Sequence, residues 1–518
     1  MKQYKENDLP EGWTEIGLDQ ILQTLESGSR PKGGVREIKE GVPSIGGEHI
    51  NENGGFRFEA IKFVPRNFFK QMNHGQIQTG DILIVKDGAT TGKVALVRED
   101  FPYNPAVVNE HVFICRPVEG VYPPFLFHFL FSKGGQDRIL ENFRGSAQGG
   151  INQSFAQGTT VPLAPLPEQK RIVTKVGDLL ARVNSAKERL NKVSIILKRL
   201  RQAVLSAACS GRLTADWREY NKENSAQELV PKILNLRRSF LEINRKVGLR
   251  TRYKEPIEPA YELEFETPDT WCLSTVDQLT LLVTKGSSPK WQGFEYTDGG
   301  LPFIRSQNVL WGNLDLSDVA YLPPVFNKSH KNSIIHQGDI LLNLVGASVG
   351  RCTIATQAIE GANCNQAVAI IRLVPDGMLN KFLVYFLLSP YAQEHIHETK
   401  ADVARANFNL DDIRPMVVPV PPLSEQQEIV RRVEAMFKVV DTVENRVEAA
   451  KVRAERLTQA ILAKAFRGEL VPTEAELARR EGRSYESASE LLARIKTARE
   501  TSKKPESGQW YRANKKIH

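Results

Sequence analysis

Two glycine-rich turns are the segments of this sequence that come nearest to a nucleotide-binding loop. The first, GATTGK, runs from Gly88 to Lys93, and the second, GASVGR, ends at Arg351. A P-loop needs four residues between its glycines and a Ser or Thr after the lysine to bind magnesium. Here only three residues separate the glycines, and Val94 follows the lysine. We therefore interpret both segments as turns between strands that could present Lys93 and Arg351 to a phosphate group.

Other catalytic patterns are missing from the sequence. There is no [ND]PP[YFW] motif of the kind that holds a flipped base for amino methylation, and no glycine-rich loop for a methyl donor follows a strand. His395 and His397 are two residues apart, whereas a helical zinc pair needs a spacing of four. The five cysteines form no CxxC pair, which indicates reduced thiols and a cytoplasmic protein without a metal site. The sequence therefore predicts a non-catalytic chain.

Composition allows a polyanion partner without demanding one. Lys and Arg number 69 against 61 Asp and Glu, a net charge of +8. No apolar run approaches the roughly 18 residues of a membrane span, and no signal-peptide core stands at the start. Part of the positive charge is local, because residues 166–212 carry 11 basic and 3 acidic residues.

The elements that carry these turns occur twice, about 257 residues apart. LPEGWTEIGLDQI near the start returns as TPDTWCLSTVDQL, TGDILIVKDGATTGK returns as QGDILLNLVGASVGR, and PLPEQKRIV returns as PLSEQQEIV. RLRQAVLSAACSGRL likewise returns as RLTQAILAKAFRGEL. A constant offset through several blocks indicates one unit used twice.

Each copy combines two kinds of structure. Residues 1–165 and 267–422 contain short apolar or alternating runs punctuated by Gly, Pro and Asn, followed by an apolar helical stretch, which predicts two α+β globules. Residues 166–212 and 423–468 carry apolar residues at alternating steps of four and three, which predicts two helices with a heptad seam. About 38 residues give a helix of roughly 57 Å. We expect a charged, partly helical linker over residues 213–266 and a similar tail over residues 469–518.

The two seams are expected to pair within the chain as a coiled coil. A parallel pair would put both globules at one end, an antiparallel pair would put them at opposite ends, and the linker is long enough for either. The alternative is that each apolar stripe packs only on its own globule. Phe437, Phe466, Leu180 and Ile196 lie beside the seam and either widen its core or offer a docking face.

The order of these motifs resembles the specificity subunit of type I restriction–modification enzymes. The LPEGW start, the GDIL…DGATTGK hairpin, the PLPEQ and PLSEQ helix starts and the RLRQAVLSAACSGRL helix end all resemble that family, and the match covers almost the whole chain. The resemblance implies two target-recognition domains that each read one half of a split, asymmetric DNA site. It also implies that the helices pair antiparallel, set the spacing of the half-sites and dock two methylation subunits.

The same resemblance implies the partners and cofactors. The complex would contain double-stranded DNA, two methylation subunits that use S-adenosylmethionine to methylate adenine N6, and two restriction or motor subunits that use ATP and Mg. This chain would hold no cofactor itself. A methylation-only complex, a coiled-coil adaptor that binds proteins and a self-contained enzyme with an unrecognised site remain as alternatives.

Exposed polar residues in loops are the candidates for contact with DNA, because Arg, Lys, Asn, Gln, Ser and Thr supply major-groove hydrogen bonds. We select residues at matching places in both copies, and one segment, Arg305–Asn308, that faces Gly47, Glu48 and His49 in the first copy. The candidates are Ser29, Arg30, Lys32, Lys86, Thr90, Thr91, Lys93, Arg144, Ser146, Gln148, Asn152, Ser288, Lys290, Arg305, Gln307, Asn308, Asn343, Ser348, Arg351, Arg405, Asn407 and Asn409.

Overall fold

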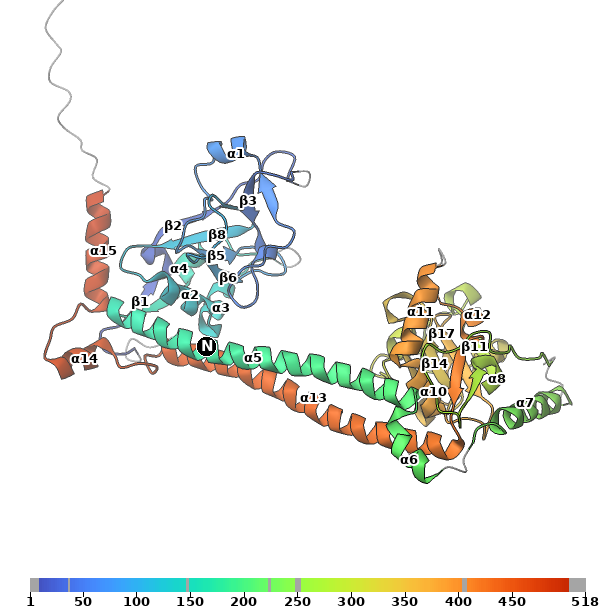
Figure 1. Ribbon diagram of the computed structural model, residues 1–518. Coiled ribbons are helices and arrows are strands. Elements are labelled where there is room, and N and C mark those ends of the chain that lie inside the picture. The colour runs from blue at the N-terminus through green and yellow to red at the C-terminus, as the bar shows by residue number, and fades with distance from the viewer. Residues whose placement is uncertain are drawn as a thin grey trace, which may run out of the picture. The chain divides into compact units, whose positions relative to one another are not determined.

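The chain folds into two compact units. The computed structural model describes residues 9–35, 38–145, 149–221, 225–246, 253–402 and 408–502. The first unit joins Met1–Leu190 to Ala449–His518, and the second unit is Asn191–Glu448. Each unit therefore contains one globule and one end of each long helix, α5 (Leu166–Cys209) and α13 (Leu423–Ala465) (Figure 1).

The globule of the first unit is built on a four-stranded antiparallel sheet with strand order β2-β8-β5-β6. A three-stranded sheet of order β4-β3-β7 and a two-stranded sheet of β1 and β9 accompany it. The strands are β1 (Thr14–Gly17), β2 (Leu22–Ser27), β3 (Val42–Ile45), β4 (Lys62–Val64), β5 (Ile82–Val85), β6 (Val94–Leu96), β7 (Val107–Val108), β8 (Val112–Pro117) and β9 (Thr160–Leu163). The helices are α1 (Arg66–Gln71), α2 (Pro123–Phe131), α3 (Lys133–Leu140), α4 (Phe155–Gly158) and the short 3-10 turns η2 (Leu18–Ile21) and η3 (Gly47–His49).

The second unit repeats this topology. Its sheets have strand orders β11-β17-β14-β15, β13-β12-β16 and β10-β18. The strands are β10 (Cys272–Thr275), β11 (Thr280–Lys285), β12 (Leu301–Ile304), β13 (Ala320–Leu322), β14 (Ile340–Asn343), β15 (Cys352–Ile354), β16 (Asn363–Cys364), β17 (Val368–Leu373) and β18 (Val417–Val420). The helices are α8 (Val276–Leu279), α9 (Val325–Ser329), α10 (Asn380–Leu387), α11 (Pro390–Asp402) and α12 (Leu410–Ile413), with 3-10 turns η5 (Lys290–Gln292), η6 (Ser306–Asn308), η7 (Lys331–Ser333), η8 (Gly346–Ser348) and η9 (Gln357–Ile359).

Alternation along the central strands creates two apolar layers in each globule. In β5, Ile82 and Ile84 join the core that includes α2 and the start of α5, whereas Leu83 and Val85 face the small sheet. In the second unit, Leu341 separates in the same way from Ile340 and Leu342. This two-sided burial explains why the strands read as continuous apolar runs.

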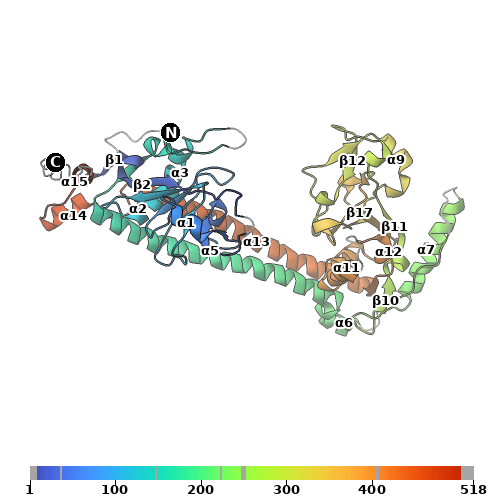
Figure 2. The same ribbon diagram turned by 90° about the horizontal axis from the view of Figure 1, so that it is seen from above.

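The two long helices run antiparallel. Within the first unit, Lys187 of α5 pairs with Glu455 of α13 at 2.5 Å. Within the second unit, Arg201 of α5 pairs with Glu444 of α13 at 2.9 Å and with Asp441. Within the same unit, Arg432 of α13 donates to the carbonyl of Leu213, just after α5, at 2.9 Å, so rising numbers in α5 meet falling numbers in α13 (Figure 2). The antiparallel pairing that the resemblance implied is confirmed.

The seam between the helices is narrower than the heptad pattern predicts. One position per heptad is buried along most of each helix, as in Val176, Val183 and Leu197, and is partly buried at Leu190 and Ala454. The other seam position is buried only at the helix starts, at Ile172 and Ile429, and is half-buried or exposed farther along, where Leu200 and Leu457 are 45% and 52% exposed. Two helices that pack only on each other can bury only a narrow strip of apolar side chains between them. Here ion pairs lie along the sides of that strip.

The motifs that carry the resemblance fasten each long helix to its globule. Trp13 Nε1 donates to Glu168 at 2.9 Å, and Trp271 Nε1 donates to Glu425 at 2.8 Å. The neighbouring glutamines cap the globule backbone, because Gln169 accepts from the amide of Tyr122 and Gln426 from that of Leu379, both at 2.8 Å. The Trp and the Glu-Gln pair are therefore structural anchors.

The segment after each long helix packs on a globule. In the second unit, η4 (Arg212–Thr214), α6 (Ala215–Tyr220) and α7 (Leu229–Lys246) follow α5, and Ile233 is buried in the core. In the first unit, α14 (Glu474–Glu481) and α15 (Ala488–Ser502) follow α13, and Leu491 and Ile495 are buried in the core. The region expected as a tail thus completes the globule that begins the chain.

A glycine in the left-handed conformation follows the end of each long helix. Gly211 has φ 73° and Gly468 has φ 70°. A Cβ on Gly468 would come within 2.3 Å of Pro10, and one on Gly211 within 2.5 Å of Pro268. Both the backbone conformation and the proline contact therefore require glycine.

Candidate nucleic-acid interface

A ribbon of backbone hydrogen bonds brings distant loops of the first globule together. Beyond the end of the β5–β8 ladder, the amide of Lys86 donates to the carbonyl of His111 at 2.9 Å, and the amide of Ile151 donates to the carbonyl of Lys86 at 2.7 Å. Arg144 and Gly150 then exchange two bonds of 3.0 Å. Four segments separated in sequence thus lie side by side, which we call the strand-end ribbon (residues 86–87, 111, 144 and 150–151).

The strand-end ribbon collects three of the predicted contact residues around one cavity. Lys86, Arg144 and Asn152 line a hollow of about 430 Å³. Its other walls are Ser27, Asp87, Phe113, Asn142, Gly150, Ile151 and Gln153. The Lys86 ammonium lies 5.7 Å from the centre of the Phe113 ring. Cations and amides on a concave surface suit a polyanion with hydrogen-bonding groups.

A chain of charged side chains borders this cavity, and the sequence reasoning missed it. Asp87 Oδ1 lies 2.6 Å from His111 Nδ1. Glu110 Oε1 lies 3.5 Å from His111 Nε2 and 3.4 Å from Arg30. The selection was limited to cations, amides and hydroxyls, so it passed over both carboxylates. His111 lies just before an apolar strand, and that position was the available signal.

Ser29 and Arg30 line a second hollow of about 150 Å³ on the same globule. Ser29 lies 3.3 Å from His74, and Lys32 nearby is exposed. Lys62 pairs with Glu48 at 2.6 Å at this hollow. Partial burial opposes ionisation of Glu48, but its bonds to Lys62 outweigh that effect and lower its pKa.

The glycine-rich turn of the first globule has a fixed backbone. Gly88 and Gly92 have φ of 85° and 88°. The Thr91 hydroxyl donates to the carbonyl of Gly88 at 2.6 Å, and Thr90 accepts from the amide of Lys93 at 3.1 Å. The Lys93 ammonium lies 3.4 Å from Glu52. This is the turn between strands that the sequence predicts, since it joins β5 to β6.

The second globule repeats the ribbon backbone with apolar side chains. The amide of Leu344 donates to Ala367 at 2.9 Å, and that of Phe408 donates to Leu344 at 3.1 Å. These residues stand where the first globule has Lys86, His111 and Ile151. Val345 occupies the place of Asp87. At these four positions the described residues of the second copy carry no charge, whereas the first copy has Lys86 and Asp87.

Polar groups of the second globule gather instead around Asp318. Arg305 lies 3.0 Å from the Asp318 carboxylate, and Gln307 donates to it at 2.7 Å. The amide of Arg305 donates to Asn308 at 2.9 Å, as that of Gly46 donates to His49 in the first globule. Arg305 thus corresponds to Gly46, which corrects the expected match with Gly47 by one residue.

Two predicted contact residues of the second globule are buried. Asn308 donates to the carbonyls of Asp315 and Asp318 at 2.9 and 3.0 Å. Asn343 is 0% exposed and donates to the carbonyl of Ser306 at 2.8 Å. Their amides hold the loop backbone in place, so neither side chain belongs to an exposed surface.

The remaining candidates have various surroundings. Asn409 caps α12 by accepting from the amide of Asp411 at 2.8 Å, and Ser348 donates to Val345 at 3.3 Å. Lys290 is exposed, whereas Ser288 and Arg351 are partly buried. Ser146, Gln148, Arg405 and Asn407 lie outside the described residues.

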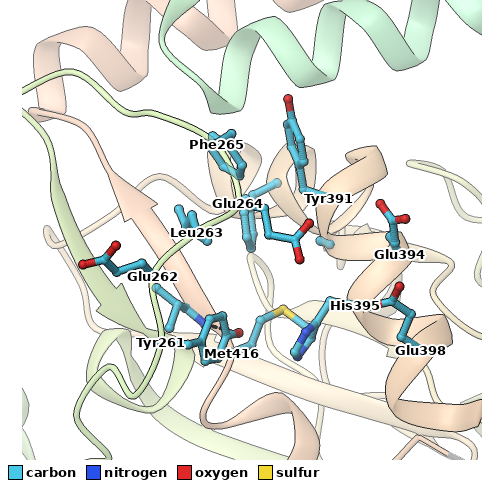
Figure 3. Close-up of a pocket in the computed structure, with 13 residues that line it drawn as sticks. Tyr261, Glu262, Leu263, Glu264, Phe265, Tyr391, Glu394, His395, Glu398 and Met416 are labelled. Atoms are coloured by element: carbon cyan, nitrogen blue, oxygen red, sulfur yellow. Dashed lines mark hydrogen bonds between the residues drawn. The ribbon is translucent and has the colours of Figure 1, made fainter. Parts of the chain in front are cut away.

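An acidic pocket on the second unit is a poor place for a phosphate. The extended segment 261–265 faces α11 across a cavity of about 310 Å³ (Figure 3). Phe265 stacks on Tyr391 with ring centres 4.1 Å apart. Glu262, Glu264, Glu394 and Glu398 also line the pocket, and four carboxylates repel a nucleic-acid backbone.

Within the described part of the chain, no group of three or more His, Cys, Asp or Glu is placed to hold a metal ion. Among the same residues, no helix is long and apolar enough to cross a membrane.

Comparison with known proteins agrees with this architecture of two α+β globules, each followed by a long helix. The family model for the type I restriction modification DNA specificity domain matches residues 10–194 and again 268–451. The chain therefore belongs to the family of type I restriction–modification specificity subunits.

Curated relatives match over most of the chain. The type I restriction enzyme EcoBI specificity subunit of Escherichia coli is 30% identical over 469 residues, covering 89% of this chain and 86% of the relative. The EcoKI specificity subunit of Escherichia coli (strain K12) is 28% identical over 471 residues, covering 89% and 90%. A chain from a solved type I R-M system has a TM-score of 0.57 at 21% identity, covering 90% of this chain and all of that one, and supports the fold.

Proposed function

We propose that each globule of this specificity subunit is a target-recognition domain that reads one half of a bipartite, asymmetric DNA site. The supporting observation is the strand-end ribbon, which has one backbone course and different side chains in the two copies. Lys86 and Arg144 give the first copy charged donors and His111 adds a polar ring, whereas the second copy has the apolar Leu344 and Ala367 in the places of Lys86 and His111. Surfaces with different hydrogen-bonding groups select different base pairs, so the two half-sites should differ.

The long helices are proposed to set the distance between the half-sites. Helix α5 has 44 residues and α13 has 43. At 1.5 Å a residue, each helix is about 65 Å long. That length exceeds the roughly 34–36 Å of one turn of DNA, so half-sites separated by more than one turn suit helices of this size.

The methylation subunits are proposed to dock on the exposed apolar side chains of the long helices. In the second unit, Ile195 and Ile196 of α5 are 54% and 59% exposed, and Val439 of α13 is 64% exposed. Phe437 packs near Tyr385 and Arg201, and Phe466 is buried in the first core. The exposed residues are therefore better docking candidates than the phenylalanines.

The chain is proposed to be a non-catalytic cytoplasmic component of the complex. In this assignment, S-adenosylmethionine binds to two methylation subunits that modify adenine N6. ATP and Mg bind to two restriction or motor subunits. This chain supplies the recognition of DNA.

Mapping methylated adenines in cells that express the chain with its methylation subunit tests the proposal. The expected result is one split motif with two different halves and a fixed spacer. Lys93→Ala and Arg351→Ala should each weaken methylation through one half-site. Absence of sequence-specific methylation, together with no shift of DNA fragments by the purified complex, would contradict the proposal.

A further inference from the structure

The pairing of His111 with Asp87 fixes the imidazole at the edge of the strand-end ribbon. A carboxylate accepts hydrogen bonds, so the 2.6 Å contact assigns the proton on Nδ1 to the bond with Asp87. The His111 amide donates to Asn109 Oδ1 at 2.9 Å, which holds the loop in a turn. The ring is thus positioned through both its side chain and its backbone.

The other ring nitrogen is available to a ligand. His111 Nε2 lies 3.5 Å from Glu110 Oε1, at the outer limit of a hydrogen bond. Glu110 is also near Arg30, and Lys86 and Arg144 line the cavity on the Asp87 side. The His111 side chain is 48% exposed.

The second copy has no equivalent pair. Its ribbon carries Ala367 in the place of His111 and Val345 in the place of Asp87, on the same course of backbone hydrogen bonds. The fold therefore does not require the His–Asp pair at this position. A polar pair that the scaffold can dispense with, between two cavities, points to a role in recognition.

We propose that His111 is a specificity-determining residue of the first recognition domain and that Asp87 is its positioning residue. This inference rests on the proposed function. When the ring proton lies on Nδ1, toward Asp87, His111 Nε2 and the Glu110 carboxylate offer two neighbouring acceptors, and the matching group on a base edge is the exocyclic amino group of adenine or cytosine.

The test compares methylation motifs of the whole complex with the wild-type chain, His111→Ala and Asp87→Asn. For His111→Ala, discrimination at one base pair of one half-site should fall by about tenfold, while the other half-site and the spacer stay unchanged. Asp87→Asn should relax the same base pair by a smaller factor. His111→Gln, which keeps an acceptor, should retain more discrimination than His111→Ala.

A second His–carboxylate pair provides the matched control. His336 Nδ1 lies 2.9 Å from Glu360, with exposures of 51% and 38% that resemble the 48% and 36% of His111 and Asp87. Its position, before β14, is at the opposite end of the strand from the ribbon. His336→Ala should leave the whole motif unchanged.

The outcomes separate this inference from the function that it rests on. An unchanged motif in His111→Ala, in a complex that still methylates a split site, would overturn the role of His111 alone. Uniformly weaker methylation without relaxation at one base pair would also overturn it, because that is the result expected of a structural residue. A wild-type complex without a sequence motif would instead refute the proposed function.

Discussion

The two globules share the same backbone hydrogen bonds in their strand-end ribbons but carry different side chains there. Lys86 and Leu344 each donate from the main chain to the carbonyl of the residue just before β8 or β17, and each accepts from a later loop. The Lys86 side chain is charged and the Leu344 side chain is apolar, and His111 is polar where Ala367 is apolar. Main-chain bonds do not depend on side-chain identity, so a duplicated scaffold can keep its frame while its exposed residues change.

The anchors of the long helices differ in a second way. Glu425 is buried beside Arg218, Trp271 and Thr214. Glu168 accepts from Trp13 and from the amide of Glu474, and its burial raises its pKa. In the second unit the anchor carboxylate of Glu425 forms an ion pair with Arg218. In the first unit the carboxylate of Glu168 accepts hydrogen bonds from uncharged donors.

The largest effect on stability is expected from substitution of the anchor glutamates, and it should differ between the two units. Glu425→Gln leaves the partly buried Arg218 cation without its charge partner and should cost about 3–5 kcal/mol of unfolding free energy. Glu168→Gln loses one acceptor and should cost about 1–2 kcal/mol. Calorimetry of the full chain should show a greater decrease in Tm for the first variant. Equal losses would remove the difference between the anchors.

Acid should destabilise the first unit more than the second. Burial lowers the pKa of His128 to about 4, from an ordinary value of 6.5, and Arg98 adds to the effect. The unfolded state binds this proton at a higher pH than the folded state, so stability is complete above pH 6.5 and is lost as the pH falls toward 4. The full loss corresponds to about 3 kcal/mol.

The second unit provides the comparison, because Tyr385 stands at the matching place in FLVYFLLS. Unfolding followed from pH 7 to pH 4 by a probe in each unit should show the first unit losing more stability. His128→Phe should reduce that difference. If the variant keeps the full acid sensitivity of the first unit, another group is responsible.

A smaller effect concerns the arginines that fasten the segments after the long helices. Arg237 of α7 donates to the carbonyls of Thr280 and Lys254 at 3.0 Å and is 7% exposed. Arg499 of α15 donates to the carbonyls of Gln20, at 3.0 Å, and Leu22 and is more exposed.

Arg237→Ala should therefore cost about 2–3 kcal/mol and Arg499→Ala about 1 kcal/mol, because a buried carbonyl left without a donor is the more costly. Chemical denaturation of the two variants measures the difference. A greater loss in Arg499→Ala would mean that the helices after α13 matter more to their unit than those after α5.

The smallest effect is expected from substitutions that remove a charge from the first ribbon or add one to the second. Lys86→Leu removes one cation, and the slope of log affinity against log salt should fall in magnitude by about 1 if Lys86 contacts a phosphate. Leu344→Lys should increase that slope by a similar amount if the second ribbon also faces DNA. Binding of the complex to its mapped site over a range of salt concentrations provides the measurement. An unchanged slope in both variants would place the ribbons away from the backbone.

Much of the architecture could be predicted from local patterns. The runs DILIVK and DILLNLV contain strands β5 and β14, the apolar stretches PFLFHFLFS and KFLVYFLLS begin one residue after the starts of helices α2 and α10, and the heptad residues lie on α5 and α13. The width of the buried seam between α5 and α13 was predicted wrongly. The heptad pattern marks apolar positions, but it does not show how many of them two helices can bury.

The candidate site could be predicted only in part. Lys86, Arg144 and Asn152 were selected as separate loop residues, and the hydrogen-bonded ribbon joins them. Asn308 and Asn343 have residue types that suit DNA contact, yet their amides satisfy buried carbonyls. A sequence does not reveal which polar side chains are needed by the backbone around them.

By itself, the sequence determined that one unit is used twice and which elements it contains, because helix and strand periods and helix ends are local properties. The tertiary structure decided that residues after Gly468 complete the first core and that His111 and Asp87 meet across the ribbon. These contacts join residues far apart in the chain, so they depend on the packing of the whole globule.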